Sequence, residues 1–574
     1  MWDTTVRAAW STAGFFILMG CSDDSGHGLT APAGVSAVVI PDEIPERGAD
    51  IKGAKLWSAE SDSTLWLAAS KLGNAFAIGV KTPGARRGIY KATRLVDQNT
   101  WLQAHEILAR QPGEEVYKVD PILPLIKARI NDYAAFLRIR RLPFVDYIEP
   151  ALVARADVLL SSELSGCPYP GNNSPHGAYD GYGDFIPRTY SYSKVDWAWY
   201  YAPEAGAGIT VGLVDTGVDR NITELGSAFT TGLSTGRWFA QTTTIGGETV
   251  TCSHGSRLAG VIAAPRNGTG AVGVAYRANL YSSWGQEYVI STNGVDQQQA
   301  IRDAVNGGAK VVSMAWATIY AQNCVDDEIN YNYYDPNRNV LFVGAAGTTP
   351  AGSTQNFVMF PASKWEVLAV SAADYDGTRD NQSHYGPELD LVSYHPIGTV
   401  GAPGLTLDET GNSSAATGFV TGVAALVRAR YPWMTNRQAM DRMIATAGMA
   451  CRHYSVFRPI INAEAAVGGM CELYANGPLI VEFYDESPQC QTVTYSAVHS
   501  GGVGPFSYQW NWGDPGTPTN TQAIQQTFCR PATSVDDYAY VYFQFTDHGW
   551  SSPGLMDTQI ASLNMRGWEV FSDR

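Results

Sequence analysis

Three short motifs each place one chemically active side chain next to an apolar segment. The first contains Asp215, which follows the apolar run 209–214 and precedes Thr216-Gly217. An aspartate that ends a strand lies at the carboxyl edge of an open α/β sheet, where such sheets bind their ligands. Asp-Thr-Gly also occurs in aspartic proteases and in phosphoryl-transfer enzymes. This motif alone therefore predicts either a catalytic carboxylate or a plain strand-end turn.

The second motif contains His254, which precedes Gly255 and the small-residue segment 256–262. Glycines in such a segment allow a helix to approach its neighbour closely. A single histidine is more often structural than catalytic. At the mouth of a closely packed helix, however, an imidazole can take up and release a proton near neutral pH.

The third motif contains Ser413 and Ser414, which precede a long run of small residues, 415–426. This run predicts a buried helix with a serine at its start. Backbone N–H groups at a helix start favour negative charge, so the oxyanion of an acyl transfer would be stabilised there. Taken alone, the motif is more typical of a serine that caps a core helix. Ser413 and Ser414 are competing nucleophiles.

Together the three motifs resemble those of the subtilisin family: Asp-Thr-Gly, His-Gly-Thr-x-x-Ala-Gly, and Gly-Thr-Ser-x-Ala before a buried helix. Their order, Asp then His then Ser, separates this family from α/β-hydrolases and chymotrypsin-like enzymes. The resemblance implies a serine endopeptidase in which Ser414 is the nucleophile, His254 the general base and then acid, and Asp215 the group that orients the imidazole. Counting back from the helix at 422–426 places the family's serine at 414. A zinc metalloprotease is excluded because no His-Glu-x-x-His occurs.

The resemblance also implies a substrate cleft. The strand 311–314 aligns with the family's substrate-binding strand, so its continuation would pair with substrate backbone by β-augmentation. The cleft residues implied in this way are Ala315, Trp316, Ala317, Ala345, Ala346 and Gly347. The N–H of Ser414 would supply one oxyanion donor. The chemistry requires no cofactor, no metal ligand is assigned, and the resemblance does not locate calcium ligands.

Several residues depart from the family pattern. Thr348 stands where the family has the asparagine that donates to the oxyanion, and it keeps one O–H donor with a shorter reach. Ser256 replaces a threonine, Asn412-Ser413 replace Gly-Thr, and Gly418-Phe419 replace Pro-His. Two alternatives follow. One is a pseudoprotease impaired by the missing asparagine, and the other is an adhesion or carbohydrate-binding protein that acts through its C-terminal segment.

The segment 191–474 alternates strand-like and helical patterns. Such alternation implies parallel strands that are buried on both faces. We therefore predict an α/β fold, a subtilisin-like parallel sheet flanked by helices. The strand-like runs are 209–214, 311–314, 340–343 and 367–370, and the clearest helical stretch is 299–306.

The segment 55–155 is predicted to be an α+β prodomain. Its end, Tyr147-Ile148-Glu149-Pro150, looks like the last strand of a subtilisin-type inhibitory prodomain. The prodomain would act as an intramolecular inhibitor. Strand-like runs are expected at 65–67 and 75–78, and helix-like runs at 101–110 and 125–141. Residues 156–190 are rich in Pro, Gly, Asn and Ser, which predicts an exposed processing loop, with self-cleavage between about 150 and 190.

The chain changes character after 475–478, where Ala-Asn-Gly-Pro breaks the pattern. Beyond this break, apolar residues alternate with period two, and short runs are separated by Gly and Pro. This pattern predicts an all-β sandwich over 478–574, which resembles the Ig-like or PKD-type modules appended to secreted hydrolases. The alternating residues include Phe506, Tyr508, Trp510, Trp512, Ala539, Val541, Phe543 and Phe545.

The N-terminus carries an export signal. Arg7 precedes the short, mostly apolar stretch 8–19, and Leu18-Met19-Gly20-Cys21 resembles a bacterial lipoprotein box. We predict a signal peptide over 1–21, lipidation of Cys21, and a tether over 22–54. The protein would then be secreted or held at the cell envelope by its lipid. The alternative is a plain signal peptide with an incidental cysteine.

The eight cysteines show no C-x-x-C spacing, which argues against a zinc site and for disulfides in an oxidising compartment. The most plausible local pairs are Cys451 with Cys471 and Cys490 with Cys529. If Cys21 is lipidated, seven cysteines remain, and at least one is unpaired.

Composition restricts the partners. The 574 residues are 45% hydrophobic and 16% charged, which is typical of a globular protein of two to four domains. The net charge of −16 argues against nucleic acid, whose binding needs a basic surface. No apolar run reaches the roughly 18 residues of a membrane span. The resemblance to the subtilisin family implies that the partners are polypeptide substrates.

Overall fold

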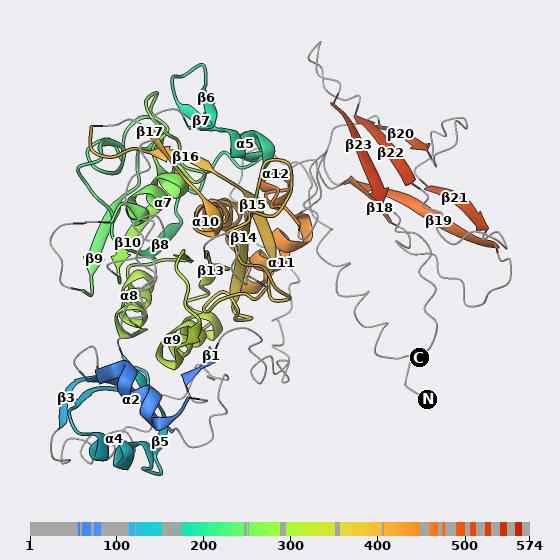
Figure 1. Cartoon of the computed structure of the whole chain (residues 1–574). Coiled ribbons are helices and arrows are strands. Elements are labelled where there is room, and N and C mark those ends of the chain that lie inside the picture. Colours follow the sequence, from blue (N-terminus) through green and yellow to red (C-terminus); the bar gives the residue numbers. More distant parts are fainter. Residues whose placement is uncertain are drawn as a thin grey trace. The chain divides into compact units, whose positions relative to one another are not determined.

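The computed structural model describes residues 55–57, 60–70, 74–81, 114–120, 122–151, 167 and most of 175–468, together with six strands between 473 and 564. The gaps within 175–468 are 246–249, 251, 287–293, 350–355, 405–406 and 448–458. The described residues up to 467 belong to one compact unit, and those from 468 onward belong to a second (Figure 1).

A seven-stranded sheet forms the centre of the first unit, in the order β15-β14-β13-β11-β8-β10-β9. Every neighbouring pair is parallel. The strands are β8 (Thr210–Asp215), β9 (Phe239–Thr243), β10 (Asn279–Trp284), β11 (Val311–Met314), β13 (Leu341–Ala345), β14 (Val367–Ala373) and β15 (Leu391–Tyr394). Strands β8, β11, β13, β14 and β15 are buried at every residue, as expected for a parallel sheet covered on both faces. The predicted α/β fold is confirmed.

Helices cover this sheet (Figure 1). Helix α10 packs along α7 and across β13 and β14, while α8 packs on β8 and β10. At Gly212 of β8, an added Cβ would lie 2.8 Å from the Cβ of Ala304, so the glycine allows α8 to approach the sheet closely. The longer helices are α7 (His254–Ala263), α8 (Gly294–Asn306), α9 (Asn323–Tyr334), α10 (Asn412–Arg430) and α11 (Asn436–Thr446), and the shorter ones are α5 (Arg188–Tyr192), α6 (Val195–Tyr201) and α12 (Ala463–Ala466).

The carboxyl ends of the central strands meet at one edge of the sheet. After β8 the chain forms β9 and β10 on one side of it and then crosses to β11 on the other side, so the direction in which strands are added changes at β8. Open α/β sheets bind ligands at the carboxyl edge beside such a switch point. Asp215, Ala315 and Ala345 lie at or directly after the ends of β8, β11 and β13, so this edge is the place for the predicted site.

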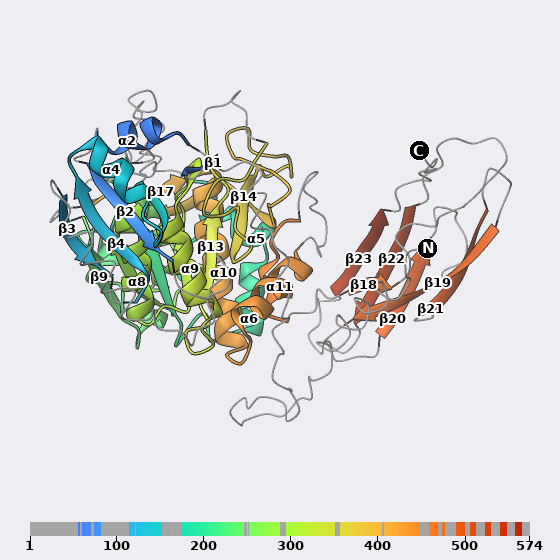
Figure 2. The same ribbon diagram turned by 90° about the horizontal axis from the view of Figure 1, so that it is seen from below.

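The segment 55–151 folds around its own sheet, which is antiparallel with the order β3-β4-β2-β5 (Figure 2). Its strands are β2 (Ala75–Val80), β3 (Glu114–Val119), β4 (Leu125–Ile130) and β5 (Val145–Pro150), and its helices are α2 (Asp62–Ser70) and α4 (Tyr133–Arg140). Phe76, Ile78, Ile126 and Phe136 are among the residues of a core that this segment builds for itself. The segment is therefore α+β.

Two local predictions in this segment are wrong. The run 65–67 lies in α2, where Leu65 and Ala69 are buried four residues apart on one face of the helix. The run 125–141 is not one helix, because β4 ends at Ile130 and α4 begins at Tyr133 after the cap Asp132, whose carboxylate accepts from the N–H of Ala135. The helix expected at 101–110 lies outside the described residues.

The last part of the segment 156–190 is not the exposed loop that the sequence predicts. Strands β6 (Gly177–Tyr179) and β7 (Phe185–Pro187) form a hairpin, and α5 follows directly. Phe185, Tyr190 and Val195 belong to the core of the seven-stranded sheet, so the peptidase-like domain begins before 190. A second hairpin, β16 (Ile397–Val400) and β17 (Leu407–Thr410), leads into α10.

The second unit contains two antiparallel three-stranded sheets, β18-β19-β21 and β20-β22-β23. The strands are β18 (Leu473–Asn476), β19 (Cys490–His499), β20 (Phe506–Asn511), β21 (Ala523–Cys529), β22 (Tyr540–Asp547) and β23 (Asp557–Asn564). The described part of this segment is thus all β. Across the described residues of both units, no helix has the length and apolar character that a membrane crossing requires.

Candidate active site

Asp215 and His254 form a buried hydrogen-bonded pair at the carboxyl edge of the sheet. Asp215 is the last residue of β8, and His254 is the first residue of α7. The Nδ1 atom of His254 lies 2.8 Å from Oδ1 of Asp215, and the two residues are only 3% and 1% exposed. A carboxylate that accepts from Nδ1–H leaves Nε2 as a proton acceptor. This is the geometry of a general base.

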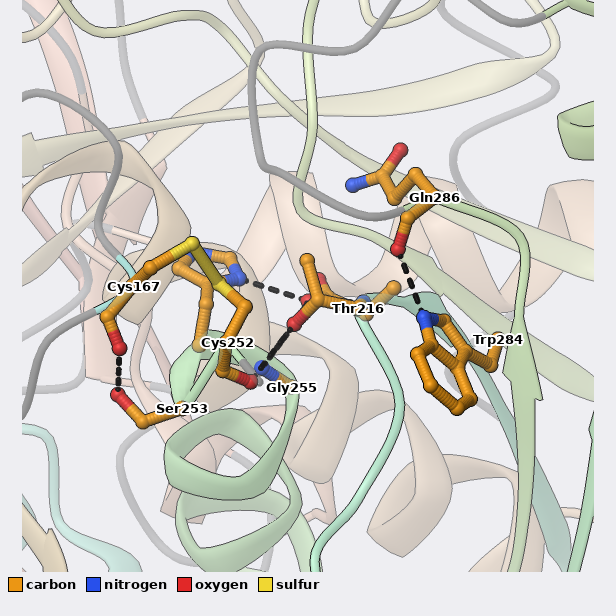
Figure 3. The surroundings of a disulfide bond; sticks show 9 residues. Cys167, Thr216, Cys252, Ser253, Gly255, Trp284 and Gln286 are labelled. Atoms are coloured by element: carbon orange, nitrogen blue, oxygen red, sulfur yellow. Dashed lines mark hydrogen bonds and ion pairs between the residues drawn. A yellow bond between two sulfur atoms is a disulfide. The ribbon is translucent and has the colours of Figure 1, made fainter. Parts of the chain in front are cut away.

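Thr216 holds the carboxylate in place. Its backbone N–H donates to Oδ1 of Asp215 at 2.7 Å, and its hydroxyl lies 3.2 Å from the same oxygen. The hydroxyl oxygen also accepts from the N–H of Gly255 at 3.0 Å, which connects the end of β8 to the first turn of α7 (Figure 3). A Cβ at Gly255 would lie 2.3 Å from the carbonyl oxygen of Gly217. The residue after the histidine is therefore glycine because β8 and α7 meet there.

The two candidate serines have different environments at the start of α10. Ser413 is 1% exposed, and its hydroxyl donates to the carbonyl oxygen of Gly347 at 3.0 Å. Ser414 is half-buried, and its hydroxyl donates to the carbonyl oxygen of Ala315 at 3.1 Å. The Nε2 atom of His254 is buried and has no hydrogen-bond partner among the described residues. Catalytic hydrogen bonds often form only when substrate is bound. The geometry thus favours Ser414 over Ser413.

The hydroxyl of Thr348 forms a hydrogen bond with the hydroxyl of Ser413. The two hydroxyl oxygens are 2.9 Å apart. A serine hydroxyl has one proton, and that of Ser413 is donated to Gly347. Thr348 must therefore donate its own proton to Ser413. Before Thr348 could donate directly to a substrate oxyanion, as predicted, its hydroxyl would have to leave Ser413.

We expect Thr348→Val to lower kcat by about 10²-fold. The loss of one oxyanion donor typically lowers kcat by roughly 10²- to 10³-fold. Thr348→Asn should raise kcat with little change in KM. Thr348→Ser, which keeps the hydroxyl, is the matched control. Steady-state kinetics on a peptide substrate measure all three variants. If Thr348→Val had the kcat of the unchanged protein, the second donor would be another group.

The predicted cleft residues flank the serine. Ala315 and Trp316 follow β11 and are buried, and Ala317 is partly exposed. On the other side, the N–H of Ala346 donates to Val370 and its carbonyl accepts from Met359. The N–H of Ala346 is therefore already paired within the protein and does not donate to substrate backbone. Ala345 ends β13, and Gly347 has a φ of +117°, which favours glycine.

A disulfide that the sequence analysis missed joins Cys167 to Cys252, across 85 residues (Figure 3). Ser253 adds two hydrogen bonds to the carbonyl oxygen of Cys167, one from its N–H and one from its hydroxyl. The segment around Cys167 is thus attached directly before His254. The nearness of Cys252 to the histidine motif was a signal, but nothing in the sequence identified its partner.

The other cysteine predictions are not tested. Cys451 and Cys471 lie outside the described residues. The strand register places Cys490 opposite Cys529 in β19 and β21. Cys324 is a buried free thiol at the start of α9, and burial raises its pKa well above the usual value.

One cluster of potential metal ligands lies beside the start of α10. It consists of Asp374, Asp380 and His395, whose ligand atoms lie within 4.8 Å of one another. The Nδ1 atom of His395, however, accepts from the backbone N–H of Asn412 at 3.1 Å. A neutral imidazole that accepts at Nδ1 carries its proton on Nε2. Nε2 therefore faces the two carboxylates as a donor, and this arrangement does not fit a metal ion.

Comparisons with known proteins identify the family of this chain. The model of the subtilase family matches residues 206–477. The chain is 35% identical over 207 residues to a thermostable alkaline protease of Halalkalibacterium halodurans, and the match covers 34% of this chain and 52% of that protein, about half its length. It is 30% identical over 269 residues to subtilisin Savinase of Lederbergia lenta, and this match covers 46% of this chain and 91% of that protein. Among solved structures, MycP1 from Mycobacterium smegmatis is 21% identical with a TM-score of 0.41, and the match covers 52% of this chain and 88% of MycP1. The chain therefore belongs to the subtilase family of serine endopeptidases.

Proposed function

We propose that this chain is an exported endopeptidase that hydrolyses peptide bonds through an acyl-enzyme on Ser414 and processes its own precursor. The observation that carries the proposal is the buried pair of Asp215 and His254, at the sheet edge where Ser414 lies in the first turn of α10 and contacts the end of β11. His254 Nε2 would take the proton of Ser414 as the hydroxyl attacks the peptide carbonyl. The same nitrogen would then return the proton to the leaving amine.

The substrates would be polypeptides. An extended peptide could lie along the end of β11 and pair with the backbone at Ala317. The oxyanion would form beside the N–H of Ser414, at the start of a helix of 19 residues. Helix N-termini favour negative charge, so this position supports an acyl-transfer intermediate.

A fluorophosphonate label tests this function. Such a reagent phosphonylates an activated serine, and peptide mapping identifies the residue. We expect the label on Ser414 in the full-length protein and none in Ser414→Ala. A label on Ser413 would contradict the assignment of the nucleophile. A protein that takes no label would instead support a pseudoprotease or a binding protein.

Residues 55–151 would act as the intramolecular inhibitor. Their sheet contacts α8 and α9 through buried polar side chains. Glu149 accepts from the N–H groups of Asn323 and Cys324 at 2.9 and 3.0 Å, so a carboxylate of this segment lies at the start of α9. Arg302 of α8 lies 2.5 Å from both Asp120 of the segment and Glu328 of α9. These contacts would hold the segment on the peptidase domain after cleavage.

We expect Glu149→Ala to speed release of the cleaved prodomain by about 10- to 100-fold, because buried N–H groups of α9 lose their acceptor at a cost of roughly 1–3 kcal/mol. The lag before peptide hydrolysis begins measures this release. Asp146→Ala, which changes a carboxylate on an exposed position of the same strand, is the control. An unchanged lag in Glu149→Ala would show that the contact with α9 does not control inhibition.

The same carboxylate makes release depend on pH. Burial raises the pKa of Glu149, so the docked prodomain holds this proton to a higher pH than the free one does. By linkage, docking is strongest below the free pKa and weakens as the pH rises through the docked pKa. The lag should therefore shorten with rising pH in the unchanged protein, and less so in Glu149→Ala.

Export and attachment rest on the N-terminus, which lies outside the described residues. We propose that cleavage after Gly20 exposes Cys21 for acylation and that 22–54 is the tether to the enzyme. The mass of the mature N-terminal peptide checks this: a diacylglyceryl cysteine at position 21 is expected. An unmodified chain that starts elsewhere would mean a freely secreted enzyme. The all-β segment after 478 would be an appended Ig-like or PKD-like module.

A further inference from the structure

The helix that carries the nucleophile begins in an unusual conformation. Its first residue, Asn412, has a φ of +59°, in the left-handed region that favours glycine. Asparagine adopts this conformation more readily than other non-glycine residues do, because its short amide can hydrogen-bond nearby. The preceding residue, Gly411, has no side chain that could cap the helix. Other contacts must therefore stabilise the turn that leads to Ser414.

Three hydrogen bonds hold Asn412. Its side-chain amide donates to Oε1 of Gln382 at 2.8 Å and to Oδ2 of Asp380 at 3.2 Å. Its backbone N–H donates to Nδ1 of His395 at 3.1 Å. This last bond matters most for catalysis, because it orients the peptide plane from which the chain continues to the hydroxyl and the N–H of Ser414, two residues later.

His395 is itself held from both ends. Its backbone N–H donates to the carbonyl oxygen of Ala373 at 3.0 Å. Its Nε2 atom lies 3.1 Å from Oδ1 of Asp374 and 3.7 Å from Oδ1 of Asp380. The ring is buried, and two nearby carboxylates favour the tautomer with the proton on Nε2. That tautomer presents a lone pair at Nδ1, which is what the N–H of Asn412 requires.

We propose that His395 is a positioning residue for the nucleophile. Asp374 and Asp380 set the tautomer of His395, His395 holds the N–H of Asn412, and Asn412 sets the direction of Ser414. No hydrogen bond joins His395 to Ser414 among the described residues, so His395 acts through Asn412. A misplacement of about 1 Å can cost up to about 10²-fold in turnover. This inference rests on the proposed function.

Two substitutions of His395 test the roles of its two ring nitrogens separately. His395→Asn places an amide oxygen near the position of Nδ1, where it can accept from Asn412 but cannot reach the carboxylates. His395→Gln places its polar atoms near Nε2 and leaves the N–H of Asn412 without an acceptor. We expect kcat to fall about tenfold in His395→Ala and His395→Gln, with KM within about twofold, and to stay within about threefold in His395→Asn.

The kcat values are divided by the fraction of protein that the fluorophosphonate labels, so that unfolded protein does not count. His176→Ala is the matched control. Like His395, His176 lies beside a carboxylate, in its case through Nδ1 and Glu409, but it is largely exposed. EDTA treatment of the unchanged protein should leave kcat unaffected. If EDTA lowered kcat and Zn²⁺ or Ca²⁺ restored it, the cluster would be a metal site and the proposal would be wrong.

The remaining outcomes are equally decisive. Equal losses in His395→Asn and His395→Ala, or full activity in His395→Ala, would overturn the positioning role while leaving the peptidase assignment intact. An unchanged protein that neither hydrolyses peptide nor takes the label would overturn the proposed function, and the inference with it.

Discussion

We expect Ser414→Ala to abolish peptide hydrolysis and to leave the precursor uncut. The substitution removes the only hydroxyl that both starts α10 and faces the end of β11 in the described site, where it contacts the carbonyl oxygen of Ala315. Loss of the nucleophile in a serine triad costs about 10⁶-fold in kcat, since His254 and Asp215 then have no hydroxyl to activate. Hydrolysis of a chromogenic peptide and the size of the purified chain measure the two effects.

Ser413→Ala is the control for this experiment. Ser413 is buried and bonded to Gly347, so its loss should slow the enzyme only through Thr348, by about tenfold or less. If Ser413→Ala were inactive and Ser414→Ala active, the nucleophile would be Ser413. If the Ser414→Ala precursor were cut normally when made alone, another protease would carry out maturation.

We expect Asp215→Asn to lower kcat by about 10⁴-fold while the fold is kept. An asparagine can present its NH₂ group to Nδ1 of His254, so the ring then carries its proton on Nε2 and cannot accept one from Ser414. The N–H of Thr216 donates at 2.7 Å to the same oxygen that faces Nδ1, so the NH₂ group takes this position only if that bond breaks, and an asparagine that keeps the bond still removes the carboxylate charge from the imidazole. Binding groups in the cleft are untouched, and KM should change little.

Asp219→Asn is the matched control for Asp215→Asn, because Asp219 lies on the same connection and, among the described residues, its carboxylate accepts from the backbone N–H and the side-chain amide of the nearby Asn221 rather than from a histidine. Thermal unfolding of both variants shows whether the fold is kept. A fall in kcat of less than tenfold for Asp215→Asn, with an unchanged melting temperature, would mean that Asp215 does not set the tautomer of His254.

Four strands of the large sheet, β8, β11, β13 and β14, could be predicted because each of them is buried at every residue. Such strands must be apolar throughout, and their carboxyl ends must carry the polar residues, so the run 209–214 and Asp215 could be interpreted together. The strands and helices of the smaller, antiparallel segment 55–151 were harder to predict from the sequence. Its strands and helices are short, and in α2 the apolar residues Leu65, Trp66 and Leu67 are adjacent, so period-two and helical patterns look alike there.

The sequence by itself determined which side chains could do chemistry at this edge: the order Asp215, His254, Ser414 depends on residue types and on short motifs that local structure dictates. The tertiary structure decided how protons and partners are distributed among them. In the folded protein Cys167 lies beside Cys252, and the N–H of Asn412 donates to His395. The hydroxyl of Ser413 donates to Gly347, and that of Thr348 donates to Ser413. These contacts join residues between 17 and 85 positions apart in the chain, and a hydrogen bond depends on distance in space, which no local pattern encodes.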